Sequence, residues 1–344
     1  MFFFVSGFIM LTLMAVMLFS SAVVGAVSVN GLILISALLV MMTIGLIYKS
    51  RLEWKQSITS AMEKGMELER TDLFNFISVF LGAIITFYIS IEIISVGFDG
   101  VSSAVIASGL VGILATVLFP KYDAAIFCGS FVGMASSELF TSYYQLALAG
   151  LVASIVFVAG KYCFNGFGGK LGTTAFSGCV VAALLTGQSF VPGSIPDFSF
   201  GLQLGIYSIL GAVITYVISI RFDNSAVISS GLVGVIAGLI LPVIYPEVGA
   251  TLSVMVFCAS FAGMSSPERI PNELWVGISG IFCALIFIYT SPYFGGAGGK
   301  LGTTAFGSVV CIRGLAYIID SVRVKVLETG NEPQTNSSLS TEQQ

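Results

Sequence analysis

The chain has 344 residues, of which 56% are hydrophobic and 9% are charged, with a mean hydropathy of +1.00 and no histidine. A soluble domain averages about 25% charged residues, so this composition excludes an ordinary soluble fold and indicates a polytopic membrane protein. The net charge of −4 carries little information about partners, because the acidic excess lies in loops and the tail, and no stretch is basic enough to indicate nucleic-acid binding.

Two hydrophobic segments, Phe2–Val24 and Asn30–Tyr48, open the chain, and each can span about 30 Å of hydrocarbon. We interpret residues 1–48 as an N-terminal transmembrane hairpin. In the polar stretch 49–72, apolar residues recur at helical spacing, which predicts an amphipathic helix on the cytoplasmic surface. At the other end, residues 328–344 are polar and aperiodic, so we expect a disordered tail.

Two related stretches, residues 73–190 and 199–320, make up most of the rest of the chain and are called the first and second copy. GGKLGTTAF occurs at Gly168–Phe176 and again at Gly298–Phe306, and FCGSFVGMASS at Phe127–Ser137 returns as FCASFAGMSSP at Phe257–Pro267. Similar matches relate residues 81–90 to 210–219 and residues 103–120 to 225–242. Each copy holds five apolar elements, so we predict an all-α protein with about twelve transmembrane helices, two plus five plus five.

The number of crossings in each copy decides how the copies are oriented. Five crossings make the second copy inverted, whereas four make the copies parallel. With five crossings and residues 49–72 in the cytoplasm, the basic loop residues lie inside, as the positive-inside rule requires, with Lys300 as the exception. Four crossings would place Lys161, Lys170 and Arg221 outside as well. The charges therefore favour inverted repeats with both termini cytoplasmic, and we expect the plasma (inner) membrane of a bacterium.

The repeated glycine-rich phrase opens the last apolar element of each copy. A helix N-terminus presents unpaired N–H groups and the positive end of the helix dipole, which favour an anion, and the lysine adds a full positive charge. It is not a nucleotide-binding P-loop, because a leucine follows each lysine. The alternative is a simple helix–helix turn with a lysine that reaches the headgroups. The expected pathway residues are Gly168, Gly169, Lys170, Gly172, Thr173 and Thr174, and Gly298, Gly299, Lys300, Gly302, Thr303 and Thr304.

A few other residues invite a specific role. Glu92 lies in an apolar stretch and is the candidate for coupling to protons or cations, although its counterpart is Arg221. Asp99 and Asp223 each precede the second element of a copy and are predicted helix caps. The six cysteines lie in or beside apolar segments and are expected to be small hydrophobic residues. We expect neither a metal ion nor a cofactor, since histidine is absent.

These observations favour a transporter or channel for a small polar, anionic solute that passes between two inverted repeats. The alternative is a non-transporting scaffold or an accessory subunit of a membrane complex, with residues 49–72 docking a cytoplasmic partner. An enzyme is not expected, because no cluster of histidine, acidic or metal-binding residues is present. The expected partners are the lipid bilayer and a small solute or ion, and a homo-oligomer remains an open alternative.

Overall fold

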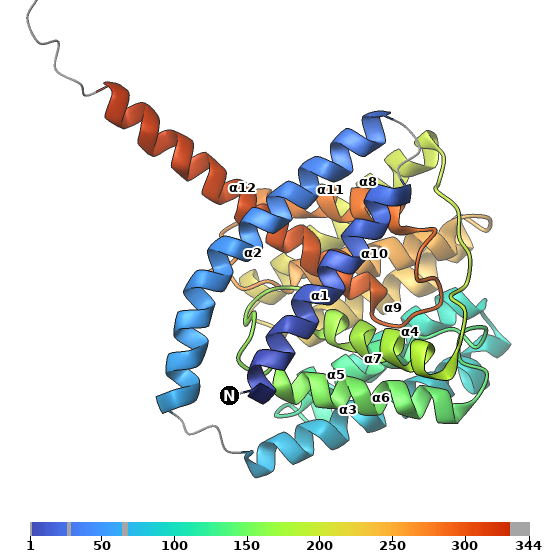
Figure 1. The fold of residues 1–344 in the computed structure, drawn as a ribbon. Helices are drawn as coiled ribbons and strands as arrows, with labels where there is room; N and C mark the ends of the chain where they lie inside the picture. Colours follow the sequence, from blue (N-terminus) through green and yellow to red (C-terminus); the bar gives the residue numbers. More distant parts are fainter. Residues whose placement is uncertain (1, 26–28, 64–67, 331–344) are drawn as a thin grey trace, which may run out of the picture.

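A computed structural model gives the fold over residues 2–25, 29–63 and 68–330, and the structural statements below concern these residues. They form twelve α-helices and no β-strand, which confirms the all-helical class (Figure 1). The helices are α1 (Phe2–Gly25), α2 (Val29–Glu63), α3 (Arg70–Tyr88), α4 (Gly100–Leu118), α5 (Asp123–Gly133), α6 (Tyr143–Ala159), α7 (Lys170–Thr186), α8 (Phe198–Tyr216), α9 (Ala226–Ile244), α10 (Gly249–Gly263), α11 (Glu273–Thr290) and α12 (Lys300–Gly330). Helices α3 and α8 each continue into a short π-helical segment, Ile89–Ile93 and Val217–Arg221.

Eight of the described helices are long and apolar enough to cross a membrane, and the shorter apolar helices are α5, α6, α7 and α10. Helix α5 has only 11 residues, which corresponds to a rise of about 16 Å, roughly half of the hydrocarbon core. The structure therefore has the twelve expected helices, but not all of them have the length of a complete transmembrane helix.

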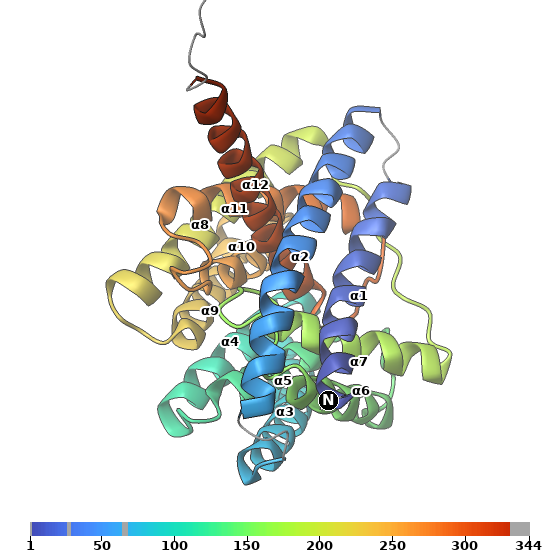
Figure 2. The same ribbon diagram turned by 60° about the vertical axis from the view of Figure 1, so that its left-hand side comes forward.

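The two ends of the chain are more helical than the sequence suggested. Helix α2 continues to Glu63, so most of the 49–72 stretch is helical as expected, but it extends a hydrophobic helix instead of forming a separate one. Helix α12 continues to Gly330, three residues into the predicted disordered tail, and no glycine or proline lies between Gly314 and Gly330 to end it earlier. This end of α12 projects away from the other helices (Figures 1 and 2). Residues 64–67 and 331–344 lie outside the described residues.

The two predicted helix caps have different outcomes. The Asp99 carboxylate accepts hydrogen bonds from the backbone N–H groups of Val101 and Ser102 at 3.0 and 2.9 Å, so the predicted cap of α4 is confirmed. The prediction for Asp223 is wrong, because Ser225 caps α9 and Asp223 lies in the preceding turn with a φ of 51°. The second copy has two residues fewer between this aspartate and the following Ser-Ala-Val, so the turn tightens and moves the cap.

Corresponding helices of the two copies pack against each other in opposite directions. Along α4, Ile106, Gly109 and Ile113 contact Gly238, Val235 and Gly231 of α9 in that order. Residue numbers rise along one helix while they fall along the other, so α4 and α9 are antiparallel. Helices α7 and α12 cross in the same manner, with Gly169, Gly172 and Phe176 against Phe306, Gly302 and Gly299.

Helices α1 and α2 have no counterpart in the copies and lie together over one face of the structure (Figure 2). Helix α1 contacts chain segments from both copies: the Phe8 ring stacks on Phe164 with centroids 5.1 Å apart, and Gly25 packs against the Tyr293 ring. Helix α2 packs along α12, where Gly45 and Gly314 allow close approach of the two backbones. The N-terminal helices therefore pack against both copies from one side.

Candidate functional site

The two glycine-rich loops that precede α7 and α12 have the same backbone shape. In the first loop, the Cys163 N–H donates to the Gly160 carbonyl at 2.9 Å, and in the second, the Tyr293 N–H donates to the Thr290 carbonyl at 3.0 Å. The same positions of both loops adopt the left-handed conformation: Phe164, Gly166 and Gly169, and Phe294, Gly296 and Gly299. A phenylalanine with positive φ is strained, so surrounding contacts must hold each loop in this shape.

Those contacts come from the opposite copy. The chain leaves α5 at Gly133, and the Ser136 N–H then donates to the Gly296 carbonyl of the second loop at 2.9 Å. Conversely, the chain leaves α10, and the Ser266 N–H donates to the Gly166 carbonyl of the first loop at 3.0 Å. Each loop is therefore fixed by the residues that follow the short helix of the other copy.

Helices α7 and α12 begin at these loops and touch at their first turns. A methyl group placed on Gly172 would lie 2.5 Å from the Gly302 Cα atom, so only glycine allows this crossing. The four threonines of the repeated phrase are buried, and their hydroxyls donate to carbonyls four residues earlier in the chain: Thr173, Thr174, Thr303 and Thr304. They stabilise the helix starts, and none of the four lines either of the two cavities described next.

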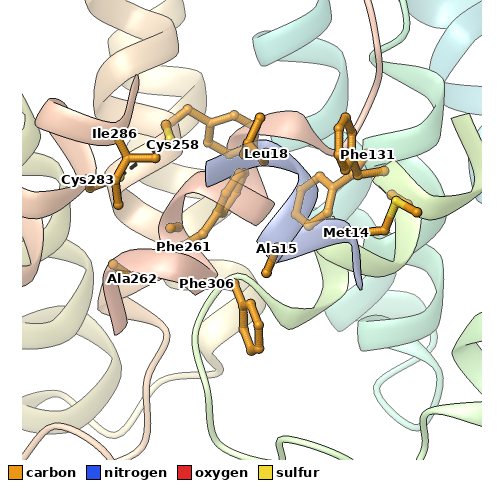
Figure 3. Packing of buried hydrophobic residues seen from close by; sticks show 14 of the residues in the cluster. Met14, Ala15, Leu18, Phe131, Cys258, Phe261, Ala262, Cys283, Ile286 and Phe306 are labelled. Carbon is orange, nitrogen blue, oxygen red and sulfur yellow. Dashed lines mark hydrogen bonds between the residues drawn. The ribbon is translucent and has the colours of Figure 1, made fainter. Parts of the chain in front are cut away.

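Beside this crossing, α5 and α10 bring four phenylalanine rings together: Phe127, Phe131, Phe257 and Phe261. The Phe131 and Phe261 rings, at corresponding positions, are the inner pair, with centroids 4.6 Å apart. They belong to the buried cluster that also contains Ala15 and Leu18 of α1 (Figure 3). The repeated Phe-x-x-x-Phe spacing in the two copies was the sequence signal for this cluster, and our sequence reading did not use it.

A cavity of about 380 Å³ lies on one side of the Phe131–Phe261 pair. Its polar lining comes from two lysines, two asparagines and the first glycine loop, and none of the described lining residues is acidic. The lining residues are Asn75, Ala124, Phe131, Phe157, Lys161, Asn165, Gly166, Phe167, Gly168, Gly169, Lys170, Leu171, Phe261 and Met264.

A second, much smaller cavity of about 50 Å³ lies on the other side of the same pair. Its lining residues are Phe131, Met134, Phe261, Ala297, Gly298, Gly299 and Leu301. Every one of these positions has its counterpart in the lining of the larger cavity, for example Met264 for Met134 and Leu171 for Leu301. The two cavities are therefore corresponding spaces of unequal size, separated by the two rings that line both.

Lys170 and Lys300 lie on either side of the crossing and make different contacts. Lys170 lines the larger cavity, and its Nζ donates to the Asn165 Oδ1 atom at 2.9 Å. The Lys300 Nζ instead donates to the main-chain carbonyls that end α11, those of Thr290 at 2.8 Å and of Tyr293. A lysine in this position compensates the negative end of a helix dipole.

An ion pair that the sequence reading missed lies beside the larger cavity. The Lys161 Nζ, which belongs to the lining, is 2.8 Å from the Asp72 Oδ2 atom at the start of α3. Burial alone would lower the pKa of Lys161, but the hydrogen bond and charge of Asp72, with a contribution from Tyr162, raise it above the usual value. Asp72 therefore offsets the charge of Lys161, and Lys170 is the second lysine of the described lining.

The remaining predicted residues fall into distinct places. Gly168 and Gly169 line the larger cavity, Gly298 and Gly299 line the smaller one, and Gly172 and Gly302 form the crossing. Glu92 is exposed on the π-helical segment after α3 and lines neither cavity. Asp72, which the sequence analysis placed in the polar stretch 49–72, instead contacts Lys161 of the larger cavity.

The described cysteines are all free and buried, as expected of small hydrophobic residues. The Sγ atoms of Cys258 and Cys283 lie 3.5 Å apart, which is a contact and not a covalent bond (Figure 3). Across the described part of the chain, no group of three or more His, Cys, Asp or Glu side chains could hold a metal ion. No protein-family model, curated protein or solved structure matches the chain.

Proposed function

We propose that this chain is a membrane transport protein that moves a small anion between two inverted copies of a five-element unit. The observation that supports this most directly is the pair of cavities with corresponding linings on the two sides of Phe131 and Phe261. Solute sites of inverted-repeat transporters lie at the repeat interface, where short helices end inside the membrane. Here α5 and α10 end at that interface, against the glycine loops.

The antiparallel packing of α4 on α9 and of α7 on α12 supports the inverted arrangement, since corresponding elements run in opposite directions. Five crossings per copy also agree with the path of α6. Its first residue, Tyr143, packs on Phe87 near the end of α3, with ring centroids 5.6 Å apart. Just after its last turn, Lys161 pairs with Asp72 at the start of α3. Helix α6 therefore returns along α3, and α5 with residues 134–142 makes the intervening crossing.

We place both termini and the mouth of the larger cavity in the cytoplasm. The mouth is marked by Lys161, and Arg269 lies beside it, where its Nε donates to the Asn165 carbonyl at 2.9 Å. Basic residues at the membrane boundary collect on the cytoplasmic side. In this orientation the protein lies in a plasma membrane, the inner membrane in a bacterium, and its larger cavity opens inward.

The charge of the larger cavity favours an anion as the solute. Lys170 contributes a full positive charge, the start of α7 contributes N–H groups and the positive end of its dipole, and Asn75 and Asn165 contribute amides. A volume of about 380 Å³ suits a small inorganic or organic anion.

The test uses the purified full-length protein and four probes: sodium nitrate, formate, sulfate and phosphate, each at constant ionic strength with gluconate as the background. An anion that binds the folded state stabilises it and so raises the melting temperature. At an anion concentration one hundred times the dissociation constant, the gain in the free energy of unfolding is about 2.7 kcal/mol. We expect at least one probe to raise the melting temperature and to cross proteoliposome membranes with this protein, and Lys170→Gln to reduce that flux about tenfold.

Lys121→Gln is the matched control, because Lys121 is exposed in the turn between α4 and α5 and does not line the cavity. Its flux should equal that of the parent protein. If none of the four probes stabilises or crosses, or if Lys170→Gln folds normally and leaves flux unchanged, the transport proposal fails. A scaffold or accessory subunit would then be the better explanation of the fold.

A further inference from the structure

Lys170 and Lys300 stand at corresponding positions, yet one faces a cavity of about 380 Å³ and the other is bound to main-chain carbonyls beside a cavity of about 50 Å³. The volume of each cavity is thus correlated with the hydrogen-bond partner of the lysine beside it. Where the lysine is held by the end of the preceding helix, the corresponding space is nearly closed. Where the lysine points into the space, it is open.

The carbonyl group that holds Lys300 has an equivalent in the first copy. Thr290 and Tyr293 correspond to Gly160 and Cys163, which end α6, and the same main-chain hydrogen bond joins each pair. The loops also share a later turn, in which the N–H of Phe167 or Ala297 donates to the carbonyl of Phe164 or Phe294 at 3.2 Å. The first loop therefore has the backbone needed to receive Lys170 as the second loop receives Lys300.

We propose that Lys170 and Lys300 exchange these roles during transport, so that each in turn is the lysine that meets the anion. In the opposite state, Lys170 binds the carbonyls of Gly160 and Cys163 and the larger cavity closes. Lys300 leaves the end of α11 and faces the opened space beside Met134 and Leu301. This inference rests on the proposed transport function and makes Lys300 a second solute-binding residue. Its contact with the carbonyls at the end of α11 belongs to the state in which the cavity on its own side is closed.

The exchange explains how an anion could meet a single lysine from either side of the membrane. Phe131 and Phe261 line both spaces, so the ring pair can separate the solute from the far side in both states. The Gly172–Gly302 crossing keeps the starts of α7 and α12 together while the two lysines exchange partners. Only the lysine side chains and the width of each space need to differ between the states.

The experiment measures how fast a membrane-impermeant, charged thiol reagent labels two reporters in full-length protein held in lipid nanodiscs. The reporters are Met264→Cys in the larger cavity and Met134→Cys at the corresponding place in the smaller one. Protein without either reporter gives the background, because the described native cysteines are buried. In the parent protein, Met264→Cys should label faster than Met134→Cys.

In the proposal, Lys300→Gln removes the contact that keeps the smaller cavity closed, so labelling of Met134→Cys should rise about tenfold, equivalent to about 1.4 kcal/mol. Lys170→Gln removes the corresponding contact of the opposite state, so it should lower labelling of Met134→Cys. Lys300→Arg keeps a charged donor and should restore a rate close to the parent value. Opposite effects of the two lysines on one reporter are the signature of exchange.

Unfolding would instead raise labelling at both reporters, and a lowered melting temperature would accompany it. If Lys300→Gln leaves the Met134→Cys rate unchanged, or if both lysine variants change it in the same direction, the exchange is wrong. That result would leave the transport proposal intact as long as Lys170→Gln still reduces anion flux. Failure of the flux test, in contrast, removes both.

Discussion

The phrase GGKLGTTAF is identical in the two copies, and the glycine loops before α7 and α12 have one backbone shape, yet the two lysines have different partners. Lys170 donates to a side chain in an open cavity, whereas Lys300 donates to the carbonyls at the end of α11. The difference cannot come from the repeated phrase itself. It shows that the surroundings of a motif decide which of its contacts are made.

The surroundings differ at positions where the copies have diverged. Asp72 and Lys161 form an ion pair at the mouth of the larger cavity, and their counterparts are Gly201 and Ser291, which cannot form one. Among the described residues, this ion pair therefore has no counterpart in the second copy. A duplicated chain can therefore keep a symmetric centre, here the α7–α12 crossing, while the surroundings of its two cavities differ.

The symmetric centre should be most sensitive at the α7–α12 crossing. A methyl group on Gly172 or Gly302 would lie about 2.5 Å from the Cα atom of the other glycine, so the helices would have to separate. We expect Gly172→Ala and Gly302→Ala each to lower the free energy of unfolding by about 3 kcal/mol, measured by denaturant titration in detergent micelles.

Gly205→Ala in α8 is the control, because a methyl group there meets no heavy atom within 4 Å. It should be neutral or stabilising by up to about 1 kcal/mol, since alanine is the better helix former. Equal losses at Gly172 and Gly205 would mean that the crossing has no special role.

The asymmetric entrance should depend on the ion pair. Asp72→Asn removes the carboxylate that contacts the partly buried Lys161, so we expect a loss of about 2 kcal/mol in the free energy of unfolding. Asp72→Asn combined with Lys161→Gln should recover most of this loss, because the charge of Lys161 is then removed as well. A double variant as unstable as the single one would show that packing, and not charge, accounts for the effect.

The pH dependence of that loss follows from the direction of the Lys161 shift. Its pKa in the folded protein is raised above the ordinary 10.5, so the stabilisation is complete below that value and disappears as the pH rises through the raised pKa. The Asp72→Asn penalty should therefore be constant between about pH 6 and pH 9. A penalty that changes strongly in this range would contradict the assigned pair.

The Phe131–Phe261 pair should act as the barrier between the cavities. Phe131→Ala removes one of the rings that line both, and we expect nitrate leakage through proteoliposomes to rise about tenfold, or about 1.4 kcal/mol in barrier height. Phe261→Ala should have a similar effect. Phe127→Ala is the control, since its ring belongs to the same cluster but does not line either cavity, and it should destabilise the protein without leakage.

The smallest effects should be equal in the two copies. Ser108 and Ser130 share a buried hydroxyl hydrogen bond of 2.8 Å, and their counterparts Ser230 and Ser260 share one of 2.7 Å. Ser108→Ala and Ser230→Ala should each cost about 0.6 kcal/mol, the average for such bonds between membrane helices. Values that differ by more than about 0.5 kcal/mol would show that the symmetry does not extend to this contact.

Several features could be read from the residues because they depend on short-range chemistry. Long apolar runs predicted the helices, Asp99 predicted its own cap, and the apolar neighbours of the cysteines predicted their burial. The shortness of α5 and the continuation of α2 to Glu63 were missed. Helix boundaries depend on packing partners. After α5, for example, the Ser136 N–H donates to the Gly296 carbonyl of the other copy.

The sequence by itself determined that this is an all-helical, apolar chain in which one glycine-rich motif occurs twice, since hydropathy and sequence identity can be read from short stretches of residues. Only the tertiary structure decided what that motif does. In the folded chain Gly172 packs against Gly302, and the Phe131 ring packs against the Phe261 ring. Lys170 lines the larger cavity, whereas Lys300 donates to a carbonyl at the end of α11. These contacts join residues far apart in the chain, and their partners follow from how the helices cross, which no stretch of sequence specifies alone.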